Sequence, residues 1–316
     1  MIKLVNDPQR PARPGDRRAW AGSGTRATLL AASLGFLGAL LCPDPALARH
    51  AAAPVATPAL SAAPGTLIRW SVPDTERCSM QRRSWPALHE TCYYPVDVLH
   101  KPGLVTITRM SRGHTETARI LVTPADYETQ SIDLGTIPQG NPTTADERQA
   151  LREERVVAKV WRRPEGPALF TLPLGEPLHP IPEARDFGAN RIFNGKPAGQ
   201  PHMGADYTAV LGSEVRAVEA GTVALAVDQF FSGQAVYVDH GDGLVSMYFH
   251  LSAIKVKAGD AVKKGDILGL VGSTGRSTGA HLFFGVRWHD ARINPQFLFE
   301  DPAKIPAIGQ EPAPHT

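Results

Sequence analysis

Short apolar runs separated by glycine, proline and aspartate turns dominate the chain from residue 66 onward. The runs TLIRWSV (66–72), LVTITRM (104–110) and ARILVT (118–123) are rich in β-branched residues and are interrupted by polar ones. This composition is typical of half-buried strands. The runs predict a small N-terminal β domain over residues 66–140.

A second series of strand-like runs follows. EVRAV, TVALAV, AVYVD and LVSMYF are separated by turns that contain glycine. A further apolar run, His281–Val286, comes directly after the glycine-rich segment VGSTGRSTG. Because side chains alternate along a strand, we expect His281 and Phe283 on one face. These runs predict an antiparallel β domain over residues 183–300.

The polar segment between the two β domains predicts one helix. Thr144 stands three residues before Glu147 in a capping-box pattern, and charged residues alternate from there to about Trp161. The predicted fold is therefore all-β, with a connecting helix and linker over residues 141–182. A flexible Pro/Ala-rich tail is expected at 301–316.

The first 48 residues have the organisation of a secretory signal peptide. A basic segment precedes about fifteen apolar residues at 27–41, and Ala46-Leu47-Ala48 forms an A-x-A cleavage site. The apolar run is shorter than the roughly 20 residues of a membrane span, so we expect no transmembrane span after cleavage. A retained N-terminal anchor is the alternative. An Ala/Pro-rich linker follows at 49–65. We expect an exported protein of the periplasm or cell envelope.

Charge and cysteine content narrow the possible partners and the compartment. The formal net charge is +2, but residues 1–48 hold six Lys/Arg and three Asp, so 27 basic and 28 acidic residues remain without them. This balance argues against nucleic acid as a partner. Cys78 and Cys92 are the cysteines outside the predicted signal peptide. An even count in an exported protein predicts a disulfide between them.

Three short motifs place histidines and an aspartate in a recognisable order. PHMGAD contains His202 and Asp206 in an H-x-x-x-D spacing, MYFHLS contains His250, and HLF begins with His281. Together with GSEVRAVEAGTV, VDHGDGL and VKAGDAVKKGDILG, this order resembles the lysostaphin/LytM-type zinc endopeptidases of metallopeptidase family twenty-three. The resemblance covers about residues 187–299. It implies a groove across an antiparallel sheet of the LytM/duplicated-hybrid type, and peptide bonds of peptidoglycan as the substrate.

The resemblance also implies a zinc site that lacks one ligand. In the family a His-Asp-His set holds one zinc ion, and two further histidines act in catalysis. His202 and Asp206 match the first two ligands. His250 and His281 match the catalytic pair. Phe283 stands where the third ligand belongs, and phenylalanine has no lone pair to offer. We therefore expect the zinc affinity to fall by orders of magnitude.

Sequence alone leaves three sources of a replacement ligand to consider. His289 is on the same strand face, but it lies roughly 20 Å beyond position 283. His281 could turn to the metal, at the cost of a catalytic group. An Asp or His of the N-terminal domain could reach into the site.

The missing ligand leaves two functions open. The favoured one is a weak or non-catalytic protein that binds peptidoglycan stem peptides or regulates a cell-wall amidase. The alternative is an active zinc metalloendopeptidase that cleaves peptide crosslinks of peptidoglycan. VKAGDAVKKGDILGLV also resembles biotinyl and lipoyl carrier domains, but the corresponding hairpin at 219–223 presents no lysine for the cofactor.

Overall fold

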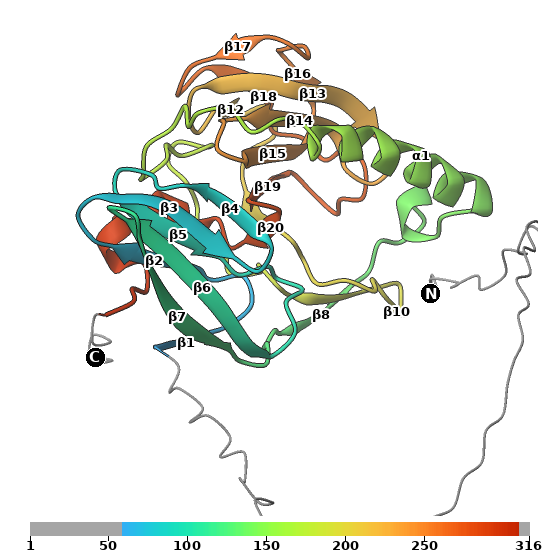
Figure 1. Cartoon of the computed structure of the whole chain (residues 1–316). Helices are drawn as coiled ribbons and strands as arrows, with labels where there is room; N and C mark the ends of the chain where they lie inside the picture. Colours follow the sequence, from blue (N-terminus) through green and yellow to red (C-terminus); the bar gives the residue numbers. More distant parts are fainter. Residues whose placement is uncertain (1–58, 310–316) are drawn as a thin grey trace, which may run out of the picture. The chain divides into compact units, whose positions relative to one another are not determined.

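The computed structural model describes residues 59–309, which are built mostly of β-strands (Figure 1). These residues belong to one compact unit. The predicted signal peptide, the predicted linker up to residue 58 and residues 310–316 lie outside the described residues. Within residues 59–309, no helix is long and apolar enough to cross a membrane. The expectation of an all-β fold is confirmed.

The N-terminal strands form two sheets joined by a disulfide. Five strands pair in the order β1-β7-β6-β3-β4, and β2 pairs with β5. Their bounds are β1 Leu60–Ala62, β2 Leu67–Ser71, β3 Thr75–Met80, β4 Arg83–Pro86, β5 Thr91–Pro95, β6 Gly103–Ser111 and β7 His114–Val122. Cys78 of β3 and Cys92 of β5 are bonded to each other and lie in an apolar cluster with Ile68, Trp85 and Tyr94. The predicted disulfide is confirmed.

Removing the disulfide should destabilise the protein. Cys78 and Cys92 are 14 residues apart in sequence, and closing a loop of that length stabilises a protein by about 3 kcal/mol in the chain-entropy account. We expect a Cys78→Ala, Cys92→Ala double variant to lose about 2–5 kcal/mol of unfolding free energy in urea. Dithiothreitol should cause a similar loss in the wild type and none in the variant. Equal unfolding midpoints for the two proteins would contradict the prediction.

The connecting helix α1 spans Thr144–Val160. Its N-cap is Thr143, because the Thr143 side chain accepts a hydrogen bond from the Asp146 amide and the Asp146 carboxylate accepts one from the Thr143 amide. The capping box therefore starts one residue earlier than the predicted Thr144. Both threonines have an acidic residue three positions later, so the sequence pattern fits either one.

Several segments expected to be linkers take part in the fold. β1 lies inside the predicted linker 49–65 and pairs in parallel with β7. Residues 301–309, placed in the predicted tail, include the 3-10 helix Pro302–Lys304 and hydrogen-bond to β2 through Ile308 N and Arg69 O at 3.0 Å. The domain boundaries given above stay a prediction.

The C-terminal strands form a large sheet and two small ones. The seven-stranded sheet has the order β11-β19-β15-β14-β13-β17, with β20 paired to β19. The three-stranded sheets have the orders β10-β9-β8 and β12-β18-β16. The remaining elements are β8 Thr129–Ile132, η1 Pro138–Gly140, β9 Asn190–Phe193, β10 Lys196–Pro197, β11 Ala205–Thr208, β12 Glu214–Arg216, β13 Gly221–Gln229, β14 Gly233–Asp239, β15 Leu244–Leu251, β16 Ala253–Ile254, β17 Ala261–Val262, β18 Ile267–Leu270, β19 His281–Trp288, β20 Ala291–Ile293 and α2 Gln296–Phe299.

The two faces of the seven-stranded sheet have different partners. Leu282 and Phe284 of β19 point into the main core, where Tyr248 of β15 also lies. Val245 and Met247 of β15 point to the opposite face, where they pack in a cluster with residues of α1. The expected alternation along His281–Val286 therefore holds. Phe283 and its cross-strand neighbours lie on the face away from the main core.

The turn between β14 and β15 contains a buried carboxyl that should make stability depend on pH. Burial raises the pKa of Asp242 to about 7. The folded state therefore binds a proton more tightly than the unfolded state, and stability is lost as pH rises from about 4 through about 7.

Asp242→Asn should remove this dependence, and asparagine tolerates the positive φ of 45° at this position. Between pH 4.5 and pH 8, we expect the wild type to lose roughly 2–4 kcal/mol more unfolding free energy than the variant. Urea unfolding of both proteins at the two pH values measures this difference. Parallel pH profiles would contradict the prediction, since all other titrating groups are shared.

Candidate functional site

Three adjacent strands bring side chains of different chemistry into one row. Asp206 of β11 lies directly opposite Phe283 of β19, and Phe283 lies opposite Phe249 of β15. Side chains that face each other across a sheet are in contact distance. The rings of Phe283 and Phe249 are stacked, with centroids 4.8 Å apart and an interplanar angle of 4°. The side chain at position 283 therefore stands beside the Asp206 carboxylate.

His202 reaches the row from the segment that precedes β11. Its side chain is 7 % exposed, and Nδ1 lies 3.1 Å from the carbonyl oxygen of Asp186 and 3.2 Å from Asp186 Oδ2. A carbonyl can only accept, so Nδ1 carries a proton and Nε2 faces the other way, toward Asp206. Nε2 lies 3.4 Å from Asp206 Oδ1. The Asp186 carboxylate thus fixes the orientation of the imidazole.

His250 reaches the same face only because its backbone is left-handed. Its φ is +62°, an uncommon value for a residue other than glycine. Simple alternation along β15 would place His250 on the face of Tyr248, inside the core. Instead its ring lies 4.7 Å from that of His281. Backbone conformations of this kind cost energy and concentrate at functional sites.

His281 starts β19 and is held by the glycine-rich loop before it. Its Nδ1 donates to the Gly279 carbonyl at 2.8 Å and lies 3.2 Å from Ser277 Oγ. Nδ1 of His250 likewise donates to the Thr274 carbonyl at 2.8 Å. The loop therefore sets the same ring orientation for both histidines, with Nδ1 protonated and Nε2 left as the lone-pair nitrogen. Nε2 of His281 lies 3.7 Å from Asp206 Oδ1.

Charges around Asp206 keep it ionised. Arg191 Nη2 bridges Asp206 Oδ2 at 2.6 Å and Asp186 Oδ2 at 2.5 Å. Burial alone would raise the pKa of the Asp206 carboxyl, but His202 and Arg191 outweigh it and hold the pKa well below its usual range. Burial opposes protonation of His202, yet the carboxylates of Asp186 and Asp206 raise its pKa. Burial, with repulsion from His281 as a smaller cause, lowers the pKa of His250 to about 4.

Three buried polar atoms in this cluster have no hydrogen-bond partner. They are Nε2 of His202, Oδ1 of Asp206 and Nε of Arg191. His202 Nε2 and Asp206 Oδ1 lie 3.4 Å apart without forming a hydrogen bond, although their charges interact. Unpaired buried polar atoms are costly in a folded protein, and a group that binds to both would remove that cost. Imidazole nitrogen and carboxylate oxygen suit zinc, so the residues present fit this metal.

Phe283 fills the place beside these atoms. Its ring is in edge contact with the His202 ring, with centroids 5.2 Å apart. It packs so closely on Gly204 that a methyl group there would lie 2.4 Å from Phe283 Cζ. His289, the distant candidate on the same strand, lies in the turn after β19 and stacks on Trp85 of β4, with ring centroids 4.2 Å apart. His289 is therefore not part of the cluster.

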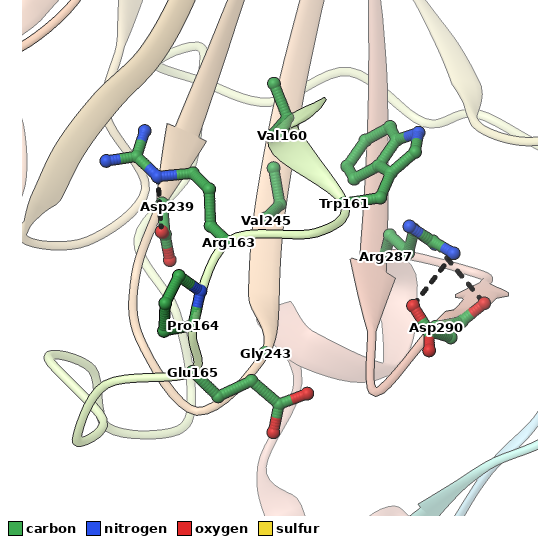
Figure 2. Close-up of a pocket in the computed structure, with 10 residues that line it drawn as sticks. All are labelled: Val160, Trp161, Arg163, Pro164, Glu165, Asp239, Gly243, Val245, Arg287 and Asp290. Carbon is green, nitrogen blue, oxygen red and sulfur yellow. Dashed lines mark hydrogen bonds and ion pairs between the residues drawn. The ribbon is translucent and has the colours of Figure 1, made fainter. Parts of the chain in front are cut away.

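A separate pocket lies on the same sheet face but does not include the cluster. Figure 2 shows it between the end of α1, the segment that follows and the strands β14, β15 and β19. Arg287 of β19 lines it and forms an ion pair with Asp290 at 2.8 Å. Arg287 is four residues from Phe283, about 13 Å along the strand. The pocket combines no nucleophile with a base, and we assign it a structural role in seating the segment after α1.

Sequence reasoning missed two charged residues of the site. Asp186 and Arg191 lie in the approach to β11, outside the quoted motifs. Asp186 also accepts a hydrogen bond from the Asp206 amide at 3.0 Å. No local pattern marks either residue, because their partners are 5–20 positions away in sequence. The four residues predicted from the motifs, His202, Asp206, His250 and His281, lie together in one cluster.

Comparison with known proteins identifies the domain that holds this cluster. Residues 200–295 match the model of peptidase family M23. The chain carries an M23 peptidase domain. A crystal structure assigned to this family, from Pseudomonas aeruginosa, covers 75 % of this chain and 94 % of its own, with a TM-score of 0.59 and 27 % identity. The likeness in fold therefore extends beyond the residues that the family model matches.

Two curated relatives resemble the M23 domain itself. The DD-carboxypeptidase/endopeptidase Mpg of Neisseria meningitidis serogroup B is 40 % identical over 94 residues, which are 30 % of this chain. The peptidoglycan DD-endopeptidase ShyC of Vibrio cholerae is 36 % identical over 95 residues, also 30 % of this chain. The chain spans 22 % of the length of each of these relatives. The similarity therefore concerns the M23 domain alone.

Proposed function

We propose that the chain is a zinc metalloendopeptidase that cleaves peptide crosslinks of peptidoglycan. The observation that carries this proposal is the pair of buried, unpartnered atoms, His202 Nε2 and Asp206 Oδ1, held 3.4 Å apart. Such a pair is stabilised when a metal ion binds both atoms. The similarity of the M23 domain to ShyC, a peptidoglycan DD-endopeptidase, supports the substrate class.

The residues around the pair have distinct tasks. His202 and Asp206 would hold zinc, which supplies Lewis-acid polarisation of the scissile carbonyl. Arg191 balances the charge of the two carboxylates. The low pKa of His250 keeps its Nε2 unprotonated at neutral pH, so this nitrogen can accept a proton from the attacking water. The glycine-rich loop holds the His250 and His281 rings in place before substrate binds.

We propose that the protein works outside the cytoplasm. The disulfide between Cys78 and Cys92 supports this, because disulfides persist in oxidising compartments. The A-x-A site at 46–48 supports it independently. Peptidoglycan also lies outside the cytoplasm, so an exported protein would meet the proposed substrate.

A second candidate function is a non-catalytic groove that binds peptidoglycan stem peptides or a cell-wall amidase. The observation that favours it is Phe283, which is 8 % exposed and stacks on Phe249 where the family has a metal ligand. A well-packed aromatic side chain stabilises the site without metal. The groove would then still bind its ligand but would not hold zinc or cleave peptide bonds.

Digestion of purified sacculi separates the two functions. The wild-type protein, purified from the cell envelope and supplied with zinc, should convert crosslinked muropeptide dimers into monomers, as measured by liquid chromatography and mass spectrometry. His202→Ala should abolish the conversion while leaving circular dichroism unchanged. Cleavage that survives in His202→Ala would refute the metal-site assignment. Binding to crosslinked peptide without cleavage by the wild type would establish the second function instead.

A further inference from the structure

We propose that Arg276 is a specificity-determining residue that binds a carboxylate of the substrate peptide. The inference rests on the proposed function in requiring that the M23 domain takes a peptide at the histidine cluster. Arg276 lies in the glycine-rich loop, between Thr274 and Gly279. The carbonyls of those two residues accept hydrogen bonds from the rings of His250 and His281. A ligand of Arg276 would therefore lie next to both histidines.

Two aromatic rings hold the Arg276 guanidinium in place. Its Cζ lies 4.2 Å from the ring centroid of Phe193 and 4.6 Å from that of Phe231. The Arg276 amide also donates a hydrogen bond to the Phe231 carbonyl at 2.8 Å. A guanidinium that stacks on aromatic rings is attracted to their faces and keeps its N–H donors in its own plane. The head group is therefore preorganised, so little side-chain entropy is lost when it binds a ligand.

Phe193 brings the Arg276 guanidinium close to the proposed metal site. Phe193 follows Arg191 by two positions on β9, so their side chains are on one face of that strand. Arg191 in turn pairs with Asp206 at 2.6 Å. Burial, with the positive charge of Arg191 as a smaller cause, lowers the pKa of Arg276 to about 10. The group therefore stays charged at neutral pH in a setting that a negative charge would stabilise.

The charge of Arg276 has no anionic partner among residues 59–309. Over that range its guanidinium forms no ion pair and no hydrogen bond. Glu153 of α1 meets the turn before β14, but its carboxylate already accepts the Phe230 amide at 2.9 Å and a Gln149 side-chain amide at 2.8 Å. None of the Arg276 nitrogens is among the buried unpaired atoms of the described chain, so a solute can reach them. Arg276 is thus an accessible cation that lacks its anion.

A carboxylate is the anion that fits this guanidinium and a peptide substrate. The planar fork of arginine matches a carboxylate or a phosphate through two parallel N–H···O bonds. Peptides carry carboxylates at their C-termini and on acidic side chains, whereas their amide groups are uncharged. A carboxylate held by Arg276 would fix the position of the peptide along the cluster. Acidic peptides should therefore be preferred over amidated ones.

The test compares three versions of one synthetic crosslinked peptide: the free acid, a version amidated at its C-termini and a version amidated at its side-chain carboxylates. Cleavage by the wild-type protein supplied with zinc is followed by liquid chromatography, and KM and kcat are measured separately. Amidation of the bound carboxylate should raise KM roughly 10–100-fold, the range for losing a bidentate hydrogen bond between charged groups. The kcat should change less than about threefold. The version that causes the rise identifies which carboxylate Arg276 binds.

Variants of Arg276 assign the effect to this side chain. Arg276→Met removes the charge and keeps an apolar stem between the two rings, so KM for the free acid should rise by the same factor. The variant should then be insensitive to amidation, as a double-mutant cycle requires. Arg276→Lys keeps the charge without the fork and should give an intermediate KM. Lys257→Met is the control, because Lys257 is 86 % exposed and pairs with Asp260, and KM should stay within about twofold.

The outcomes separate this inference from the proposed function. Equal KM values of the wild type for all three peptides would overturn the inference and leave the endopeptidase function intact, and this comparison does not depend on the folding of any variant. An Arg276→Met protein as sensitive to amidation as the wild type would overturn it too. If the wild type binds without cleaving, the endopeptidase function fails, and Kd values from calorimetry decide the inference by the same comparison. A wild type that neither cleaves nor binds the peptides would overturn both.

Discussion

Asp206→Ala should eliminate both zinc binding and peptidoglycan cleavage, the largest functional effect that we expect. Asp206 Oδ1 lies 3.4 Å from His202 Nε2 and 3.7 Å from His281 Nε2. Removing it leaves the His202 and His281 rings without this carboxylate beside Arg191, whose positive charge repels a metal cation. We expect zinc affinity to fall by more than about 100-fold and crosslink cleavage to become undetectable, because outer-shell losses alone reach 10–100-fold.

A graded series of variants makes this prediction specific. Asp186→Asn alters an orienting partner of His202 and should weaken zinc binding by about 10–100-fold, less than Asp206→Ala. Asp260→Ala is the control, since Asp260 pairs with Lys257 away from the cluster. Chelator competition and muropeptide analysis measure both properties. An Asp186→Asn variant weaker than Asp206→Ala would show that Asp186, and not Asp206, is the principal carboxylate of the site.

The strand pattern predicted the frame of the site because alternation is a local property. It placed His281 and Phe283 on one face, and the pairing of Asp206 with Phe283 then follows from the register between β11 and β19. Phe283, which the family resemblance put at the third ligand position, stacks on Phe249. A two-residue period was sufficient for these features.

Strand alternation could not predict the orientation of the His250 side chain or the part that Asp186 plays in the site. Alternation puts His250 on the core face, and the left-handed backbone that reverses it arises from tertiary contacts of β15, where the register with β14 shifts. Asp186 acts through contacts 16 and 20 residues away, which no window of neighbouring residues contains. Arg191 has the same long-range character. Features built by local geometry were therefore predictable, and those built by distant partners were not.

Arg191→Met should give one of the largest losses of stability in the protein. Arg191 is 15 % exposed and neutralises two carboxylates that are 16 % and 21 % exposed. Methionine keeps the aliphatic stem and removes the guanidinium, which leaves Asp186 and Asp206 close together with only His202 to offset their charge. Breaking a buried ion pair from one side costs about 3–5 kcal/mol. We expect a loss of this size in the unfolding free energy of the zinc-free protein, measured in urea.

Arg185→Met is the matched control. Arg185 pairs with Glu183, and their side chains are 83 % and 72 % exposed, so the variant should change stability by less than about 1 kcal/mol. Zinc should reduce the loss in Arg191→Met, because a divalent cation also neutralises Asp206, and by linkage the variant should then bind zinc more tightly than the wild type. If zinc left the stability difference unchanged, Arg191 and the metal would not share Asp206. The guanidinium would then be a purely structural group, and the charge balance of the site would have to come from the metal alone.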